Sequence, residues 1–200
     1  MNPVNANPAR LYLASQSPRR AELLQQIGVD FLKLTVDVDE TPLVQENAEQ
    51  YVARVASEKA RAGWTLLQQS NDMLLPVLGA DTSVVLAGEI MGKPDSREHA
   101  LAMLTKLSGQ THQVMTAVSL CYQQQELSAL VVTDVTFRKI TAQELDNYWR
   151  TGEPEGKAGA YAIQGLAAVF VERIAGSYSA VVGLPLLETH QLLQHIEGGH

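Results

Sequence analysis

Short apolar runs alternate with segments of helical spacing along most of this chain, and this alternation is the strongest constraint on its fold. Apolar runs with strand character occupy residues 11–15, 31–38, 75–89, 112–122, 127–138 and 167–174. Helical spacing is found at residues 17–28, 46–69, 95–109, 141–150 and 185–195. Because strands alternate with helices, and two consecutive strands in the middle of the chain favour a hairpin, we predict an α/β protein with a mixed sheet.

The size and composition of the chain favour a single domain over residues 1–200. A chain of this length with 46% hydrophobic residues can bury a real core. Residues 1–9 are polar, lack the apolar stretch of a secretory signal, and are predicted to be a disordered tail. No window reaches the ~18 apolar residues of a membrane span, so no membrane partner is expected. Cys121, the single cysteine, is predicted to be a buried thiol, which fits a cytoplasmic location.

The formal net charge of −7 argues against a nucleic-acid partner, because such surfaces normally carry a basic excess. An anionic ligand would need a few focused cations, helped by a metal ion. The five histidines lack zinc-ligand spacing, and the sequence has neither a P-loop nor an esterase elbow.

The stretch ASQSPRRAELL, residues 14–24, points to an anion site. Ser17 and Pro18 are typical of a helix start, with a hydroxyl cap and a proline in the first turn. The free N–H groups of a helix start attract phosphate, and the residues Ser15, Ser17, Arg19 and Arg20 add further donors. The alternative is a capped surface helix with two solvated arginines. Two cations oppose the helix dipole at this end, which favours the anion site.

The stretch GADT, residues 79–82, places an acid inside an apolar run. Gly79 and Ala80 leave room for something to approach the backbone, and Asp81 is expensive to bury unless it is paired, hydrogen-bonded or on a metal. Asp81 is therefore a candidate to activate a water or to bind a divalent ion. The alternative is a turn-forming aspartate between two strands.

Other charged residues are ambiguous when they are taken alone. Lys93 lies between Gly92 and Pro94 in a stiffened loop, and Lys59 lies on a helix; both also read as ordinary solvated side chains. The acidic cluster at residues 37–41 fits either a solvated turn or a second set of carboxylates that face a metal.

Two glycine-bracketed stretches near the end of the chain add candidates for binding. Tyr161 could stack on a base, and the amide of Gln164 could hydrogen-bond one. Ser177 and Tyr178 are predicted to face a site, whereas the valines at 181–182 are predicted to belong to the core.

Seven of these pieces, taken in order, resemble the Maf family of nucleoside triphosphate pyrophosphatases. They are LYLASQSPRRAELL, EKARA, VLGADTSV, GKP, LSGQTHQVMTAV, KAGAYAIQG and GSYSAVVGLP. Each piece alone is common, but the ordered set is specific and covers roughly residues 10 to 196. The resemblance implies the Maf-type fold, an elongated mixed β-sheet flanked by helices with two lobes around a cleft.

Within the family, the chain resembles the dTTP/UTP pyrophosphatase branch rather than the branch that acts on 7-methyl-GTP. The double arginine, the threonine of GADT and the glutamine of IQG carry this resemblance, which implies that Arg20, Thr82 and Gln164 set selectivity, with Arg19 beside them. The family often has AYGIQG where this chain has Ala162. An alanine fits there without strain if its φ is negative.

The resemblance also implies roles for the charged residues. Asp81 matches the catalytic aspartate of the family, and Lys59 and Lys93 match two of its lysines. The acidic position after the second strand falls on Asp39 or Glu40, and the sequence does not decide between them. A divalent cation, Mg²⁺ or Mn²⁺, is then expected on that residue and on Asp81.

The implied reaction is hydrolysis of dTTP, UTP and modified pyrimidine nucleotides between the α- and β-phosphates, to the monophosphate and pyrophosphate. The helix start with its serines and arginines would hold the phosphates. Two rivals remain: a nucleotide-sensing regulatory protein linked to septum formation and cell division, and a nucleotidyltransferase, for which no acceptor-binding module is visible. A homodimer is a family expectation, and no interface is legible in the sequence.

Overall fold

The computed structural model describes residues 9–198, so the predicted tail lies outside the described residues except for its last one. The strands are β1 (Leu11–Ala14), β2 (Phe31–Lys33), β3 (Val77–Leu86), β4 (Glu89–Met91), β5 (Thr111–Tyr122), β6 (Gln125–Phe137) and β7 (Val171–Ala175). The helices are α1 (Pro18–Gln26), α2 (Ala48–Gln69), α3 (Arg97–Leu107), α4 (Ala142–Trp149), α5 (Tyr178–Val182) and α6 (Leu186–Gly198). Two 3₁₀ turns are η1 (Ala158–Ala160) and η2 (Leu166–Phe170).

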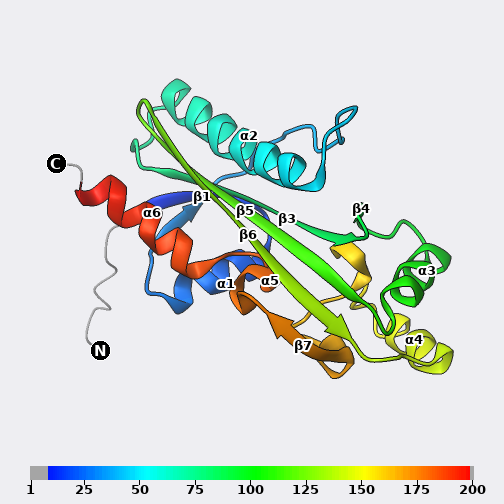
Figure 1. The fold of residues 1–200 in the computed structure, drawn as a ribbon. Helices are drawn as coiled ribbons and strands as arrows, with labels where there is room; N and C mark the ends of the chain where they lie inside the picture. The colour runs from blue at the N-terminus through cyan, green and yellow to red at the C-terminus, as the bar shows by residue number, and fades with distance from the viewer. Residues whose placement is uncertain (1–8, 199–200) are drawn as a thin grey trace.

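The strands form one mixed sheet, which confirms the predicted α/β class. The order is β2-β1-β3-β5-β6-β7, and β4 pairs with the end of β3. β1 runs parallel to β2 and β3, whereas β3, β5, β6 and β7 pair antiparallel. Figure 1 shows a long, twisted sheet with α2 on one face and α1, α5 and α6 on the other, while α3 and α4 lie at the far end.

Buried side chains gather at both ends of the elongated sheet. At the end near α1 and α6, Leu13, Leu24 and Leu193 belong to one apolar cluster, and at the end near α3 and α4, Leu104 and Phe137 belong to another. These are two of four apolar clusters among the described residues, and we call the parts of the molecule around them its two lobes. The thiol of Cys121 is buried, as predicted, and burial raises its pKa.

The strand predicted at 31–38 is wrong in its second half, because β2 ends at Lys33. β1, its partner, ends at Ala14, and the last backbone bond between the two segments runs from the Leu34 N–H to the Leu13 carbonyl, 3.0 Å. Beyond that point there is no neighbouring strand to continue the ladder. The chain instead crosses α2 as an irregular segment, in which Val36 packs on the helix side of the sheet.

The strand predicted at 167–174 is also only half correct, since β7 begins at Val171. The preceding residues form the 3₁₀ turn η2, because the carboxylate of Glu153 accepts hydrogen bonds from the N–H groups of Leu166 (2.8 Å) and Ala167 (3.2 Å). These hydrogen bonds satisfy the free N–H groups at the start of a helical turn. In a strand, the same N–H groups would point away from Glu153. The short elements β4 and α5 are absent from the sequence prediction.

Gly79 is where α2 crosses β3 most closely. A Cβ at this position would meet the carbonyl oxygen of Ala56 and lie 2.6 Å from the nitrogen of Ala60. The space that the sequence predicted beside Gly79 is therefore filled by the backbone of α2. That contact sets the distance between the helix that carries Lys59 and the strand that carries Asp81.

Substitution Gly79→Ala is therefore expected to lower the free energy of unfolding by about 2 kcal/mol, because overpacking against backbone cannot relax by a rotamer change. The matched control is Gly92→Ala, since a Cβ at Gly92 meets nothing within 4 Å. Urea unfolding of both variants measures the difference. Equal stability of the two would show that α2 does not press on β3 as described.

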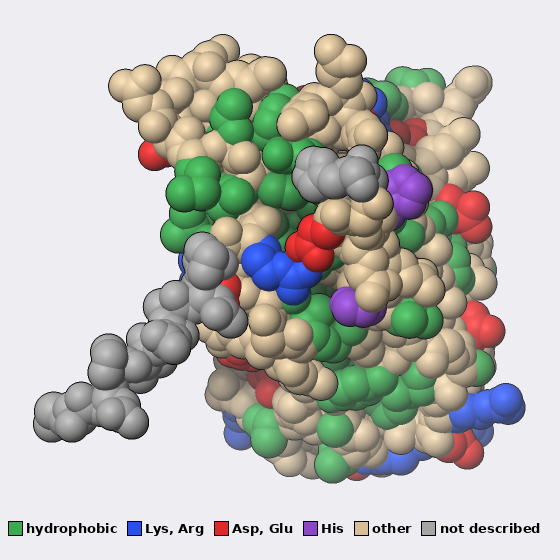
Figure 2. All heavy atoms as spheres, turned by 90° about the vertical axis from the view of Figure 1, so that its left-hand side faces the viewer, with side chains coloured by type: hydrophobic (Ala, Val, Ile, Leu, Met, Phe, Trp, Pro, Cys, Tyr) green, Lys and Arg blue, Asp and Glu red, His purple; other side chains and the backbone are tan. Residues whose placement is uncertain are grey.

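Both ends of the described chain lie at one end of the molecule. Figure 2 looks at that end and shows scattered apolar patches, with basic and acidic side chains side by side between them. The guanidinium of Arg10 makes three hydrogen bonds to the carboxylate of Glu197, at 2.6–2.9 Å, which ties β1 to the last turn of α6. Among residues 9–198, no helix combines the length and apolarity needed to cross a membrane.

Candidate active site

A cavity of about 800 Å³ opens between the two lobes, over the middle of β3. It is lined by the start of α1, by β3, by the loop after β4, by residues 155–164 and by the end of α5. Its wall carries more cations than acids, although the whole protein has a net charge of −7. The cations are Arg19, Arg20, Lys59, Lys93 and Lys157, and the acids are Glu40, Asp81 and Glu155. This local excess fits a polyanionic ligand, because charges act mainly within ~8–10 Å at physiological salt.

The start of α1 lies at one edge of the cavity. Ser17 is the N-cap residue and Pro18 begins the helix, as predicted. The predicted cap bond is wrong, however, because the hydroxyl of Ser17 makes no bond to the first turn. Its own N–H donates instead to the hydroxyl oxygen of Ser15, 3.2 Å away. The first-turn N–H groups therefore have no side-chain cap and can meet a ligand.

Arg20 is a buried cross-link rather than a solvated cation. Its Nε donates to the carbonyl oxygen of Gly183 (2.8 Å), and its terminal nitrogens donate to the hydroxyl oxygens of Ser15 (3.0 Å) and Thr82 (3.2 Å). The pKa of Arg20 is lowered, because the effect of burial is larger than the opposing effect of the negative charge of Asp81. The guanidinium thus joins α1, β3 and the end of α5 around the cavity.

Thr82 points toward Arg20 and is supported from behind by Thr116. The hydroxyl of Thr116 lies 3.0 Å from that of Thr82 and 2.6 Å from the carbonyl oxygen of Ala180, to which it donates. Thr116 is fully buried in β5 and was missed by the sequence analysis, because a threonine in a strand carries no signal of its own. The pairing of β5 with β3, which sets Thr82 opposite Thr116, is what reveals it.

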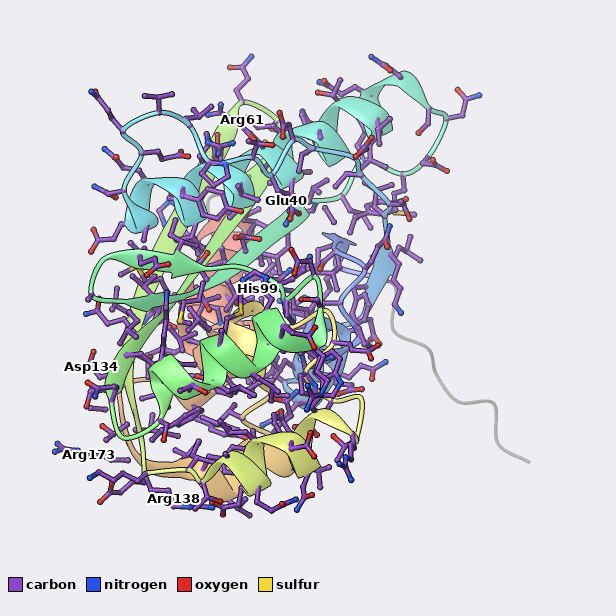
Figure 3. The ribbon with its side chains drawn as sticks, turned by 90° about the vertical axis from the view of Figure 1, so that its right-hand side faces the viewer. Glu40, Arg61, His99, Asp134, Arg138 and Arg173 are labelled. Carbon is purple, nitrogen blue, oxygen red and sulfur yellow. The ribbon has the colours of Figure 1, made fainter. Side chains whose placement is uncertain are left out.

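Lys59, Asp81 and Glu40 form the charged centre of the cavity. The ammonium of Lys59 lies 2.9 Å from a carboxylate oxygen of Asp81 and 2.7 Å from one of Glu40. Lys59 projects from α2, and Asp81 from β3, where it is 8% exposed. Partial burial raises the pKa of Glu40, but the hydrogen bond and charge of Lys59 outweigh it, so the pKa is lowered. Figure 3 shows Glu40 just below α2.

The structure separates the two acidic candidates of the 37–41 cluster. Glu40 lines the cavity, whereas Asp39 does not belong to its wall. The Asp39 carboxylate accepts a hydrogen bond from the N–H of Thr41 (2.9 Å) and is otherwise turned to solvent. The sequence could not make this distinction, because the segment after Lys33 is irregular and the directions of its side chains depend on contacts with α2.

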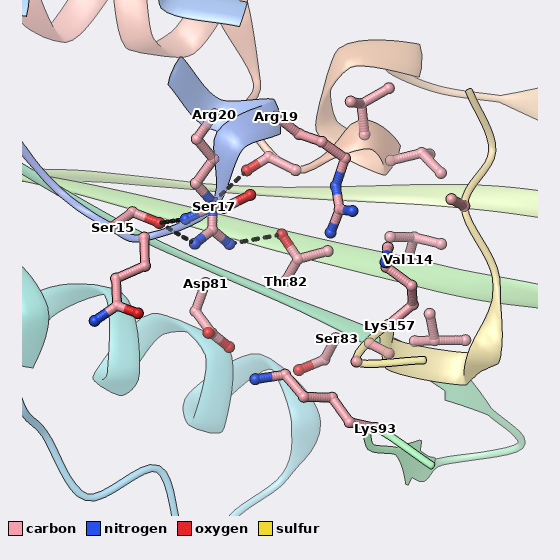
Figure 4. Close-up of a pocket in the computed structure, with 18 of the residues that line it drawn as sticks. Ser15, Ser17, Arg19, Arg20, Asp81, Thr82, Ser83, Lys93, Val114 and Lys157 are labelled. Carbon is pink, nitrogen blue, oxygen red and sulfur yellow. Dashed lines mark hydrogen bonds between the residues drawn. The ribbon is translucent and has the colours of Figure 1, made fainter. Parts of the chain in front are cut away.

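Two cations of the cavity face it without a protein partner. Among the described residues, Arg19 and Lys93 make no side-chain hydrogen bond or ion pair, and Figure 4 shows them reaching toward the cavity from opposite sides, with Asp81 and Thr82 on the strand between. Lys157 is a further cation of the cavity wall, and the sequence analysis did not single it out. Its ammonium donates to the Glu155 carbonyl oxygen (3.0 Å), and burial, with the charge of Arg19, lowers its pKa.

Apolar and uncharged residues also line the cavity. Gln164 lines it and is exposed, so its amide is available to a ligand. Tyr161 also lines the cavity, but it is only 6% exposed and its hydroxyl shares a hydrogen bond with His112 (2.8 Å), so most of its ring packs in the core. Ala162 does not have a positive φ, so it fits in place of glycine.

The expectation for the last motif is half correct. Ser177 caps α5 by accepting a hydrogen bond from the Ala180 N–H, and neither Ser177 nor Tyr178 lines the cavity. The valines at 181–182 pack against the core, as predicted, and they also line the cavity. Ser177 is a cap because α5, a five-residue helix that the sequence analysis did not predict, begins directly after it.

The donor set at the charged centre fits a magnesium or manganese ion. No group of three or more acidic, histidine or cysteine side chains that could cage a metal is found within residues 9–198. Glu40 and Asp81 supply two carboxylates, both of which pair with the ammonium group of Lys59. Mg²⁺ typically binds one or two carboxylates together with water and substrate phosphates. The residues present therefore suit an ion that arrives with a phosphorylated ligand.

Comparisons with known proteins show what this chain is similar to. The family described as Maf-like protein matches residues 10–196. The chain is 58% identical over 185 residues to the dTTP/UTP pyrophosphatase of Escherichia coli O157:H7, which covers 92% of both chains. It is 57% identical, over the same shares, to the nucleoside triphosphate pyrophosphatase of Shigella flexneri. Among solved structures, the Ham1 protein of Staphylococcus aureus has a TM-score of 0.48 at 16% identity, covering 95% of this chain and 99% of that one.

Proposed function

This chain belongs to the Maf family, and on that premise we propose that it hydrolyses dTTP and UTP, with modified pyrimidine nucleotides as further substrates. The products are the monophosphate and pyrophosphate. The observation that carries the proposal is the Asp81–Lys59–Glu40 cluster, which lies in a cavity with excess positive charge on an acidic protein. Such a cavity offers what phosphoryl transfer needs, namely positioning and charge neutralisation.

The phosphate tail binds at the start of α1. The uncapped N–H groups of the first turn and the unpaired guanidinium of Arg19 meet its oxygens, and Lys93 approaches from the β4 side. Lys157 adds a third cation, within reach of the charge of Arg19. Ser15 and Arg20 are already bonded to each other, so they shape this end of the cavity.

Asp81 activates the attacking water. Its carboxylate takes a proton from the water as the water oxygen bonds to the α-phosphorus. The bond from the α-phosphorus to the oxygen that bridges it to the β-phosphate breaks, and pyrophosphate is released. Lys59 holds the carboxylate in place and, with Lys93, neutralises the charge that develops on the departing phosphates. A divalent ion bound by Glu40 and Asp81 would supply further neutralisation of the phosphate oxygens.

The nucleoside lies against the uncharged part of the cavity wall. The Gln164 amide, which can both donate and accept, reads the polar edge of the pyrimidine, and the valines at 181–182 contact its ring. Thr82 contributes to selectivity by holding Arg20, because its hydroxyl oxygen accepts a hydrogen bond from the Arg20 guanidinium. The protein acts in the cytoplasm on free nucleotides, as a monomer or a homodimer, and removes excess or non-standard pyrimidine nucleotides from the pool.

A panel of nucleoside triphosphates tests this function. With Mg²⁺ or Mn²⁺, we expect pyrophosphate release to be at least about tenfold faster from dTTP and UTP than from dATP, dGTP or 7-methyl-GTP, a ratio worth about 1.4 kcal/mol of transition-state binding. EDTA should stop the reaction. Tight binding of dTTP without turnover would instead support the nucleotide sensor, and preference for a purine would overturn the assignment of selectivity.

A further inference from the structure

Glu40 differs from the other two members of the charged centre in how the fold holds it. Lys59 projects from α2 and Asp81 from β3, whereas Glu40 belongs to the irregular segment between β2 and α2. The side chain of Glu40 is 43% exposed, against 12% for that of Asp81. A residue on such a segment is restrained only by contacts that other elements supply.

Those contacts come from two residues on one face of α2. The hydroxyl of Tyr51 donates to the carbonyl oxygen of Glu40 itself, 3.0 Å away. The guanidinium of Arg54, one turn further on, donates to the carbonyl oxygens of the flanking residues, Asp39 (3.5 Å) and Thr41 (3.0 Å). Three consecutive carbonyl groups are thus held by one helix, with the Glu40 carboxylate left free to reach Lys59.

Arg54 is itself fixed on both sides. Its Nε and one terminal nitrogen bond both carboxylate oxygens of Glu46, at 2.6 and 2.9 Å, and its other terminal nitrogen bonds Glu58 at 3.0 Å. Glu46 also accepts from the N–H of Leu43 (2.9 Å), which closes the loop from its far end. The guanidinium lies over the ring of Tyr51, 5.6 Å from its centre.

Tyr51 lies between the loop and the charged centre of the cavity. Its hydroxyl is bonded to the backbone of Glu40, and its ring is covered by the guanidinium of Arg54. Because Tyr51 also lines the cavity, its position couples the loop to the site.

We propose that Tyr51 and Arg54 are positioning residues that fix the loop around Glu40 and so hold its carboxylate beside Lys59 and Asp81. The proposal rests on the proposed function for its kinetic readout. The clamp itself, defined here as Tyr51 and Arg54 with the three carbonyls they bind, can be tested without any turnover.

The kinetic test uses Tyr51→Phe, which removes only the hydroxyl, and Arg54→Lys, which keeps the charge but loses the fork. Each should lower kcat/KM for dTTP by about tenfold, which corresponds to the loss of one or two hydrogen bonds. Each should also raise the Mg²⁺ concentration that gives the half-maximal rate. In a Glu40→Gln background neither change should have a further effect, because residues that act through a shared partner are not additive. The matched control is Arg61→Lys, two turns further along α2 and paired with Glu126 outside the cavity, which should leave both quantities unchanged.

Amide hydrogen exchange of residues 37–47 gives the second readout. We expect it to speed up in Tyr51→Phe and Arg54→Lys but not in Arg61→Lys. Unchanged exchange in both variants would overturn the clamp, whether or not the wild type turns over a triphosphate. If the effects of Tyr51→Phe and Arg54→Lys on kcat/KM are fully additive with that of Glu40→Gln, the link to Glu40 is overturned. A wild type without turnover but with faster exchange in the variants would refute the proposed function and leave the clamp supported.

Discussion

Asp81→Asn is expected to lower kcat for dTTP by about 10³-fold, the range that loss of a general base typically costs. Asparagine keeps the size and most of the packing of the aspartate in β3, but it cannot accept the proton of the attacking water. Lys59 retains Glu40 as an anionic partner, so the fold should survive. Binding of dTTP should be unchanged or tighter, because a negative charge has been removed from a site for a polyanion.

Steady-state kinetics and calorimetric titration with a non-hydrolysable dTTP analogue separate these two effects. The matched control is Glu126→Gln, since Glu126 is also partly buried and hydrogen-bonded, but between α2 and β5 outside the cavity. That variant should keep the wild-type rate. A rate for Asp81→Asn within about fivefold of the wild type would place the chemistry elsewhere.

Arg20→Lys is expected to damage both activity and stability. A lysine ammonium can reach one of the three acceptors that Arg20 now bonds, so the Gly183 carbonyl or the Thr82 hydroxyl is left without its donor. We expect the free energy of unfolding to fall by about 3 kcal/mol, since bonds to a charged group are worth ~1.5–3 kcal/mol each. The kcat/KM for dTTP should fall about 10²-fold as α1 and α5 lose their link across the cavity.

Arg19→Lys is the matched control, because Arg19 is the neighbouring cation and makes no side-chain hydrogen bond within the described residues. It should raise KM and leave urea unfolding unchanged. If the two variants lose the same activity and the same stability, Arg20 is a simple phosphate ligand and not a cross-link.

The sequence predicted the site in outline because its residues lie in local patterns. The stretch around Asp81 reads as an acid inside a strand, and the serines and arginines at the start of α1 read as an anion site; both line the cavity. Glycine at 79 correctly indicated a close approach to the backbone. What approaches is α2, and no local pattern could identify it.

The rest depended on contacts between residues far apart in the chain. Arg20 was predicted to belong to an anion site, but the sequence could not show that it bonds Gly183, which is 163 positions away. Thr116 becomes visible only through the pairing of β5 with β3. The choice between Asp39 and Glu40 is made by Arg54 and its neighbours, which fold an aperiodic segment onto α2. The helix α5 is too short to form without the tertiary contacts that hold it.

Product analysis tests the central claim most directly. We would incubate the wild type with dTTP and Mg²⁺ and separate all nucleotides and phosphates by anion exchange. Equal amounts of dTMP and pyrophosphate, with no dTDP, are the predicted result. Formation of dTDP and inorganic phosphate, or recovery of intact dTTP that remains tightly bound, would contradict hydrolysis between the α- and β-phosphates at the Asp81–Lys59–Glu40 centre.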